Sequence, residues 1–192
     1  MEKRIFIAIN LPSNIKSLIK KRYLSFLEKK FTAVRLVPAK NLHLTLKFLG
    51  AIKLERINLL EATIKKALFD FSPFILEIKN LGGFPNFHRP KVIWLGLIDK
   101  KNNLKLINQR LNKLLKKEKF IFSEEDNFKA HITLARFKKK ISSREKESLL
   151  VFKKELGKNS LGGFRVTNID LMESQIKNEG PIYYLIKSFN LR

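Results

Sequence analysis

The sequence contains no cysteine, only three histidines, and 17 acidic residues against 40 lysines and arginines. The absence of cysteine excludes a disulfide framework and excludes zinc sites built on thiolates. No apolar run approaches the roughly 20 residues that a membrane-spanning helix needs. Hydrophobic residues, in contrast, make up 44% of the 192 positions, which is enough for a core and argues against wholesale disorder.

The start of the chain is a short apolar segment, Met1 to Asn10, that runs into Leu11-Pro12-Ser13. This segment lacks the layout of a signal peptide, so we expect a cytoplasmic protein with no membrane anchor. The chain contains no low-complexity linker. We therefore expect residues 1–192 to form one medium domain, or two small lobes that share a core.

The excess of basic residues gives a formal net charge of +23. A field of this sign attracts polyanions and favours nucleic acid as a partner. The basic residues are mostly lysines spread along the whole chain, and a lysine-rich genome would produce the same composition. Charge alone leaves both explanations open.

Helical and strand patterns alternate along the chain. Helical spacing is expected over 13–30, 54–68 and 104–115, and again after Ser142, where Glu145 completes a capping box. Strands are expected at 5–9, 34–37, 42–49, 74–78, 92–97, 128–137, 165–172 and 182–190. Gly50 is expected to end the third of these strands, and Gly82-Gly83 to form a turn.

One short pattern occurs twice: His43-Leu44-Thr45-Leu46 and His131-Ile132-Thr133-Leu134. Residues two apart in a strand point to the same face, so each histidine shares a face with a threonine and the apolar residues take the other. Two imidazoles facing one cleft supply a general base and a general acid near neutral pH. The threonine hydroxyls can hydrogen-bond the non-bridging oxygens of a phosphate held between them. The pattern therefore indicates phosphodiester chemistry, for which a strained cyclic phosphate is a suitable substrate.

The two motifs lie 88 residues apart, and the same offset aligns other segments without a gap. For example, Ile5–Ile9 falls on Ile93–Leu97, and the final strand near Ile182 repeats this strand type once more. We infer an internal duplication with a pseudo-twofold axis through a cleft between the motifs. The extra C-terminal strand is expected to pair beside one of the others.

A structural role for the histidines has to be weighed against the functional one. Taken alone, a histidine in an apolar strand is more often a satisfied core residue. Duplication alone, however, does not explain why both copies retain a histidine and a threonine. A zinc site would need further protein ligands. The third histidine, His88, is expected at the surface and Asp126 is expected to cap a turn, so we expect no metal.

Two basic residues follow the motifs. Lys47 has the parity of His43 and is expected to add positive charge to the site. Arg136 lies five residues after His131, an odd number, so in a regular strand it points to the other face. It reaches the site only if the strand bulges or twists.

With their flanking residues, the motifs resemble those of the two-histidine (2H) phosphoesterases. The resemblance is closer to one branch, the RNA 2′,3′-cyclic phosphodiesterases also called 2′-5′ RNA ligases. It covers nearly the whole chain, through the segments Arg4–Pro12, Asn41–Gly50, Leu81–Pro85, Val92–Gly96, His131–Arg136 and Leu171–Ser174.

The resemblance implies an α+β fold of two pseudo-symmetric lobes of antiparallel sheet, with helices packed outside and the active-site cleft between them. It implies an enzyme that opens RNA 2′,3′-cyclic phosphates to 2′-phosphates, with no cofactor or metal, and with 2′-5′ ligation as a reverse type of reaction. His43 would be the proton donor and His131 the acceptor, a distinction that the residues themselves leave open. Thr45 and Thr133 complete the catalytic set, and the expected substrate-binding residues are Lys47, Arg136, Phe6 and Trp94.

The expected partner is RNA with 2′,3′-cyclic phosphate ends, such as tRNA fragments, and the expected state is a monomer. Two alternatives remain: a 2H enzyme acting on small cyclic nucleotides or 2′-5′-linked RNA, and a non-catalytic RNA-binding protein. Loss of a motif histidine or threonine would favour the binding protein, and all four are present.

Overall fold

The computed structural model describes residues 1–32, 34–120, 128–157, 160–178 and 180–192. Within these ranges the helices are α1 (Ser13–Ile19), α2 (Ser25–Lys30), α3 (Ile57–Ala67), α4 (Asn103–Lys117) and α5 (Ser143–Leu156). The strands are β1 (Glu2–Asn10), β2 (Val34–Leu36), β3 (His43–Lys53), β4 (Phe74–Phe84), β5 (Val92–Ile98), β6 (His131–Phe137), β7 (Gly163–Val166), β8 (Asn168–Lys177) and β9 (Gly180–Asn190). A π-helical turn, Lys20–Leu24, joins α1 to α2.

The described strands form one antiparallel sheet in the order β7-β4-β5-β6-β3-β1-β8-β9, with β2 pairing separately with β6. The order is symmetric about its centre, since β4-β5-β6 on one side mirrors β8-β1-β3 on the other. The central strands β3 and β6 are paired at Leu44 and Ile132. The last strand, β9, pairs with β8, so the expectation that the extra strand pairs beside another is confirmed.

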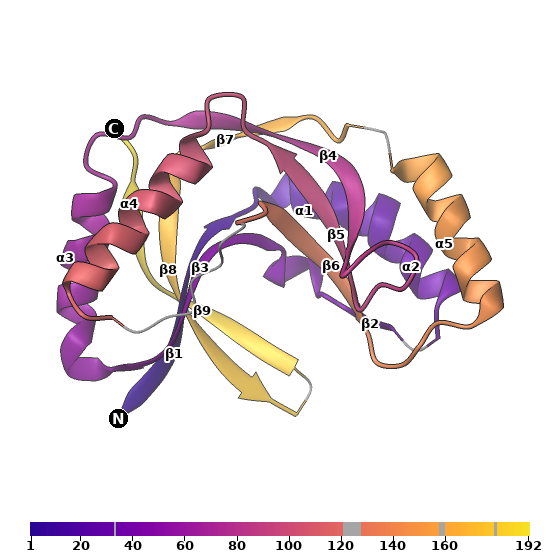
Figure 1. Cartoon of the computed structure of the whole chain (residues 1–192), viewed down its shortest axis with the longest axis horizontal. Helices are drawn as coiled ribbons and strands as arrows, with labels where there is room; N and C mark the ends of the chain where they lie inside the picture. Colours follow the sequence, from indigo (N-terminus) through magenta and orange to yellow (C-terminus); the bar gives the residue numbers. More distant parts are fainter. Residues whose placement is uncertain (33, 121–127, 158–159, 179) are drawn as a thin grey trace.

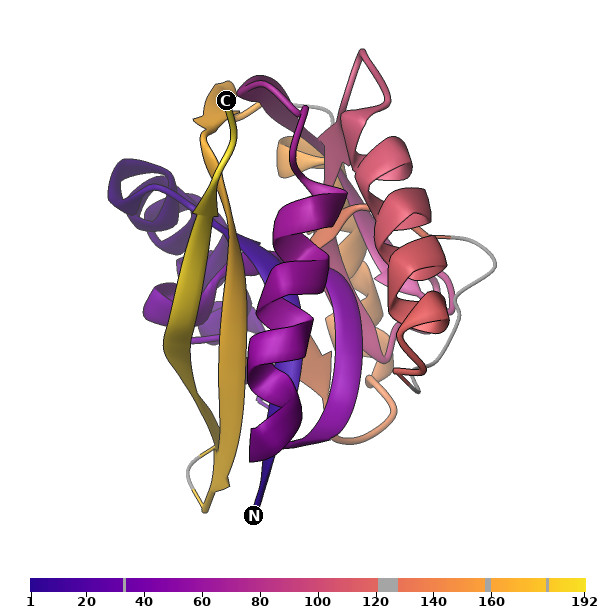
Figure 2. The same ribbon diagram turned by 90° about the vertical axis from the view of Figure 1, so that its left-hand side faces the viewer.

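The helices lie outside the curled sheet, as the α+β expectation requires (Figure 1). Helices α3 and α4 pack side by side on the half that contains β3, where the Asn108 side chain donates to the Leu46 carbonyl at 2.8 Å. Helices α1, α2 and α5 cover the other half, and Figure 2 shows α3 and α4 together on the opposite side. No helix among the described residues is both long and apolar enough to cross a membrane.

Two expected strand ends are wrong. Gly50 does not end β3, which continues to Lys53; its φ of 70° falls at a bulge where Ile5 pairs with Gly50 and Phe6 with Phe48. Gly82 and Gly83 are not a turn but part of β4. Packing explains why residue 82 is a glycine, because a Cβ at this position would overlap the Trp94 ring.

Three other local expectations concern the cap of α5 and the side chains of His88 and Asp126. The capping box at the start of α5 is confirmed, with the Glu145 N–H donating to Ser142 Oγ at 3.2 Å and the Ser142 N–H to Glu145 Oε2 at 2.9 Å. His88 is exposed, as expected. Asp126 lies outside the described residues.

Candidate active site

The register of the central strands brings the two motifs together. Because Leu44 faces Ile132 across an antiparallel pair, His43 lies level with Thr133 and Thr45 lies level with His131. Leu44 and Ile132 are fully buried on the core side. The two histidines and two threonines therefore share the opposite face of neighbouring strands, partly exposed.

A backbone carbonyl two residues earlier holds each histidine. His43 Nδ1 lies 2.6 Å from the carbonyl oxygen of Asn41, and His131 Nδ1 lies 2.7 Å from that of Lys129. A carbonyl only accepts, so Nδ1 carries the proton in both rings and Nε2 is left as the atom for acid–base chemistry. The Nε2 atom of His43 lies 2.9 Å from Thr45 Oγ1.

Aromatic side chains surround each imidazole. The ring of Phe6 lies 5.1 Å from that of His43, and Tyr183 packs edge-on to the same imidazole at 5.2 Å. Phe84 packs edge-on to His131 at 5.0 Å, with Trp94 at 6.1 Å. These contacts exclude water from one side of each ring and restrict its rotation. The predicted substrate-binding residues Phe6 and Trp94 are thus beside the histidines, although they are only 2% and 6% exposed.

Burial lowers the pKa of His43 below its usual range, and the nearby positive charges of Lys16 and His131 lower it further. The hydrogen bond to Asn41 acts in the opposite direction. A histidine with a lowered pKa is neutral at neutral pH. The approach of an anionic phosphate favours the protonated ring and opposes the desolvation.

We expect the His43 imidazole of the free protein to titrate with a pKa below the ordinary histidine value of about 6.5. The reason is the loss of hydration against Phe6 and Tyr183. NMR titration of the imidazole proton resonances measures this, with the His43 signal assigned from its absence in His43→Gln. A midpoint above the ordinary value would contradict this account of the site.

A bulge in β6 brings Arg136 to the catalytic face. Thr133 pairs with Trp94 but Ala135 pairs with Ile93, so the strand gains one residue at Leu134 and its parity reverses. Ala135 is then buried and Arg136 is exposed on the side of His131. The strand does bulge, as Arg136 requires if it is to lie on the face of the histidines.

The predicted face of Lys47 is wrong for the same reason. Thr45 pairs with Ala8 but Lys47 pairs with Ile7, which places an extra residue at Leu46. Lys47 is 5% exposed on the core side, and Phe48 takes the outward position, 6.1 Å from Phe6.

Several residues beside the histidines were not predicted from the sequence: Tyr183, Arg35, Asn41 and Lys129. Tyr183 comes from β9, and burial raises its pKa while Arg136 and Arg35 oppose that rise. Arg35 comes from β2, where it pairs with Arg136. Asn41 and Lys129 could have been found, since the repeat offset of 88 relates them. Tyr183 and Arg35 depend on strand pairing between distant segments and have no local signature.

The substitution Gly82→Ala should displace Trp94, because the new Cβ would overlap the indole ring. Overpacking of this kind costs about 1–3 kcal/mol in the free energy of unfolding. Trp94 is the only tryptophan, so its fluorescence reports the displacement directly while urea unfolding measures the stability. Gly163→Ala is the milder control, because its Cβ would lie 3.1 Å from the nearest atom, Ile75 Cγ2, and a shift of a few tenths of an ångström in that side chain relieves the contact. Unchanged fluorescence and stability in Gly82→Ala would contradict the packing described.

The described residues contain no group of three or more His, Cys, Asp or Glu side chains that could hold a metal ion. The site offers instead two imidazoles, two hydroxyls and nearby guanidinium groups. This set can transfer protons and can bind an oxyanion.

Residues 6–191 match the family described as "AKAP7 2′5′ RNA ligase-like domain". The chain belongs to this family, a branch of the 2H phosphoesterases. A Methanocaldococcus jannaschii protein named RNA 2′,3′-cyclic phosphodiesterase is 32% identical over 186 residues, which cover 97% of this chain and 99% of that protein.

Two solved structures share the fold over almost their whole length. TT0787 of Thermus thermophilus is 25% identical with a TM-score of 0.82, covering 98% of both chains. E. coli LigT complexed with 3′-AMP is 25% identical with a TM-score of 0.77, covering 100% of this chain and 99% of that one. The expected α+β fold of the 2H phosphoesterases is therefore confirmed.

Proposed function

We propose that this protein hydrolyses RNA 2′,3′-cyclic phosphate ends to 2′-phosphomonoesters, using its two motif histidines as acid and base without a metal ion. The observation that carries the proposal is the pairing of β3 with β6, which sets two His-x-Thr motifs level on one face. The M. jannaschii relative is named RNA 2′,3′-cyclic phosphodiesterase, and this name supports the choice of substrate.

In the proposed reaction His131 Nε2 takes a proton from water as the water oxygen bonds to phosphorus. The bond from phosphorus to the 3′ oxygen breaks, and His43 Nε2 gives its proton to that oxygen. Assignment of His43 as the donor rests on the family resemblance. The geometry supports the choice of atom, since Asn41 and Lys129 hold each Nδ1 proton and leave Nε2 for transfer.

The hydroxyls of Thr45 and Thr133 are proposed to donate to the non-bridging phosphate oxygens. Arg136 is proposed to add positive charge, since it shares the catalytic face and acts electrostatically on Tyr183. Phe6 and Trp94 are proposed to shape the site beside the two imidazoles. Lys47 has no such support, because it lies on the core side.

The proposal extends to the setting of the reaction. We expect a cytoplasmic monomer acting on the cyclic ends of tRNA fragments, and we expect 2′-5′ ligation of such ends as the reverse type of reaction.

Incubation of a short RNA that ends in a 2′,3′-cyclic phosphate, with EDTA present, tests the proposal. The expected product is the 2′-phosphate, identified against authentic 2′- and 3′-phosphate standards. If the RNA is bound but stays intact, the enzymatic proposal fails for this substrate. Turnover of 2′,3′-cyclic AMP or of 2′-5′-linked RNA would then point to the small-nucleotide alternative, and turnover of neither to a binding protein.

A further inference from the structure

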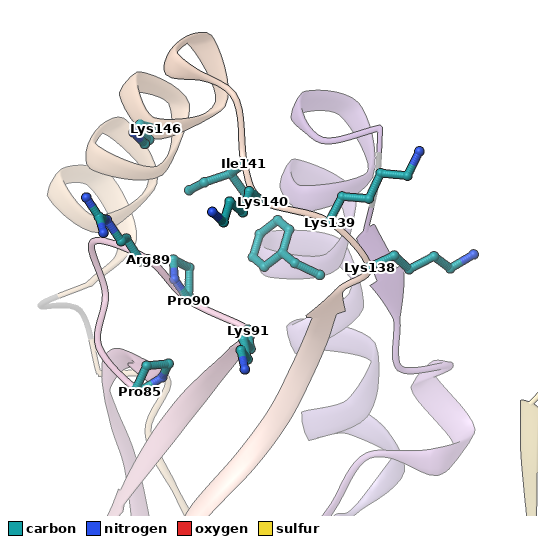
Figure 3. Close-up of a pocket in the computed structure, with 10 residues that line it drawn as sticks. Pro85, Arg89, Pro90, Lys91, Lys138, Lys139, Lys140, Ile141 and Lys146 are labelled. Carbon is teal, nitrogen blue, oxygen red and sulfur yellow. The ribbon is translucent and has the colours of Figure 1, made fainter.

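A cavity of about 700 Å³ lies at the far end of the β5–β6 ladder, away from the two histidines. It opens between the β4–β5 loop and the segment that leads from β6 to α5 (Figure 3). Its volume falls in the range of small-ligand sites in proteins, about 300–1,000 Å³. The lining residues are Pro85, Arg89, Pro90, Lys91, Phe137, Lys138, Lys139, Lys140, Ile141 and Lys146.

The cavity is cationic, with six of its ten lining residues basic and none acidic. Figure 3 shows Arg89 and Lys140 on the side of α5, and Lys138 and Lys139 extending in the other direction. Four ion pairs among the described residues involve basic residues outside the cavity, namely Lys3, Lys53, Arg110 and Lys187. The cavity therefore holds positive charge that no carboxylate of these pairs offsets.

Glu145, the first acidic residue after the basic run Lys138–Lys140, is already engaged. Glu145 accepts hydrogen bonds from the N–H of Ser142 at 2.9 Å and from the N–H of Thr32 at 3.3 Å. These bonds hold the pKa of its carboxyl below the usual value, with the bond from the Ser142 backbone as the largest cause. Its charge is used to order the start of α5.

The walls of the cavity are ordered by backbone contacts. The Phe137 N–H donates to the Lys91 carbonyl at 2.9 Å, and the Lys91 N–H donates to the Phe84 carbonyl at 2.7 Å. The Asn86 side chain accepts from the N–H groups of His88 and Arg89, both at 3.0 Å. A loop fixed in this way presents its cations with less entropy to lose on binding.

The cavity and His131 lie at opposite ends of β6, and the cavity opens on the core side of the strand, where the Phe137 ring packs against Phe31. An RNA strand that occupies both places would pass around the end of β6. Phe137 lies six residues beyond His131, which is about 20 Å along a strand. Arg136 and its β2 partner Arg35 lie between the two places. A strand with stacked bases, at about 3.4 Å per nucleotide, covers this distance in about six nucleotides.

From this arrangement we infer that the cavity binds the phosphodiester backbone of the substrate RNA strand, several nucleotides 5′ of the cyclic phosphate. The inference rests on the proposed function, because a cyclic phosphate at a 3′ end leaves the rest of the RNA only on its 5′ side. The cations match the phosphates, and the apolar side chains of Pro85, Pro90 and Ile141 give a surface for a ribose or base. The cavity thus makes the enzyme prefer long RNA ends to short ones.

The test compares cyclic-phosphate substrates of two and ten nucleotides, with the parent protein and two triple variants. Arg89→Gln/Lys91→Gln/Lys140→Gln removes three charges from the cavity. Lys65→Gln/Lys66→Gln/Lys113→Gln removes three from exposed positions on α3 and α4, on the other half of the molecule. The readout is kcat/KM for the long substrate divided by that for the short one.

We expect the cavity variant to lower this ratio about tenfold or more, and the control variant to leave it within about twofold of the parent. The slope of log affinity against log salt for the ten-nucleotide RNA should also fall, by about 0.7 for each lost phosphate contact. An unchanged ratio, an equal fall in the control, or an equal loss on both substrates would overturn the inference.

Failure of the proposed function gives a separate result. If the parent turns over neither substrate, fluorescence anisotropy with the same RNAs still measures binding. A loss of affinity for the ten-nucleotide RNA in the cavity variant alone would then support the cavity. Equal affinity in both variants would overturn it.

Discussion

The substitutions His43→Ala and His131→Ala should each lower kcat/KM for a cyclic-phosphate RNA by about 100- to 10,000-fold, the range for loss of a general acid or base. The carbonyl of Asn41 or of Lys129 holds Nδ1 of each imidazole, so the proposed proton transfer uses Nε2. Without the ring, one of the two protons has no carrier within reach. Steady-state kinetics on a short RNA, with EDTA present, measure the loss.

The double variant should lose little more than the worse of the two single variants. Residues that act as a unit are strongly non-additive, because removal of either partner already ends the concerted transfer. Losses that multiply would indicate that the two histidines act in separate steps.

The matched control is His88→Ala, which removes an exposed imidazole outside the site. It should retain the parent activity. His43→Gln serves as a second variant, since glutamine fills more of the space beside Phe6 and keeps an N–H for Asn41. Full activity in His43→Gln would contradict the acid–base role of this residue.

The sequence was sufficient to predict that the motif histidines and threonines share a face, because this depends on local alternation. His43 and Thr45 share a face in any regular strand, and so do His131 and Thr133. The alternation stops after four residues in each copy, where Leu46 and Leu134 form bulges. A period of two cannot place such a bulge, so it predicts the wrong face for Lys47 and leaves the face of Arg136 open.

The two bulges fall at equivalent positions of the inferred repeat, and so do Phe48 and Arg136, the residues that they turn outward. The internal duplication stays a prediction. The symmetric strand order about β3 and β6 is the arrangement that it requires.

The position of Tyr183 and the role of Gly82 could not be predicted from the sequence, because both depend on contacts between distant segments. Tyr183 reaches His43 because β9 pairs with β8 and β8 pairs with β1, a chain of pairings that has no local signal. The glycine pair predicts a turn because glycine commonly marks one. At Gly82 the absent side chain instead makes room for Trp94, a residue that is distant until β4 and β5 pair.

The second large effect concerns the threonines. Thr45→Val and Thr133→Val should each lower kcat by about 100-fold, since loss of one oxyanion donor costs about 100- to 1,000-fold. Valine keeps the β-branched shape that suits a strand, so the change removes the hydroxyl with little effect on the backbone. Because the hydroxyl contributes more as charge builds on the phosphate oxygens, the loss should fall on kcat more than on KM.

Thr45 has a second role that its variants can separate. Its Oγ1 lies 2.9 Å from His43 Nε2, so in the free protein the hydroxyl also contacts the atom proposed to transfer the proton. Thr133 is level with His43 on the neighbouring strand.

Thr45→Ser and Thr133→Ser keep the hydroxyl and should stay within about tenfold of the parent. If serine were as damaging as valine, the methyl group rather than the hydroxyl would be what matters, and the phosphate-binding role would be wrong. A pKa of His43, measured by NMR, that moved in Thr45→Val but not in Thr133→Val would show that only the Thr45 hydroxyl acts on the imidazole, as the contact between the two side chains leads us to expect.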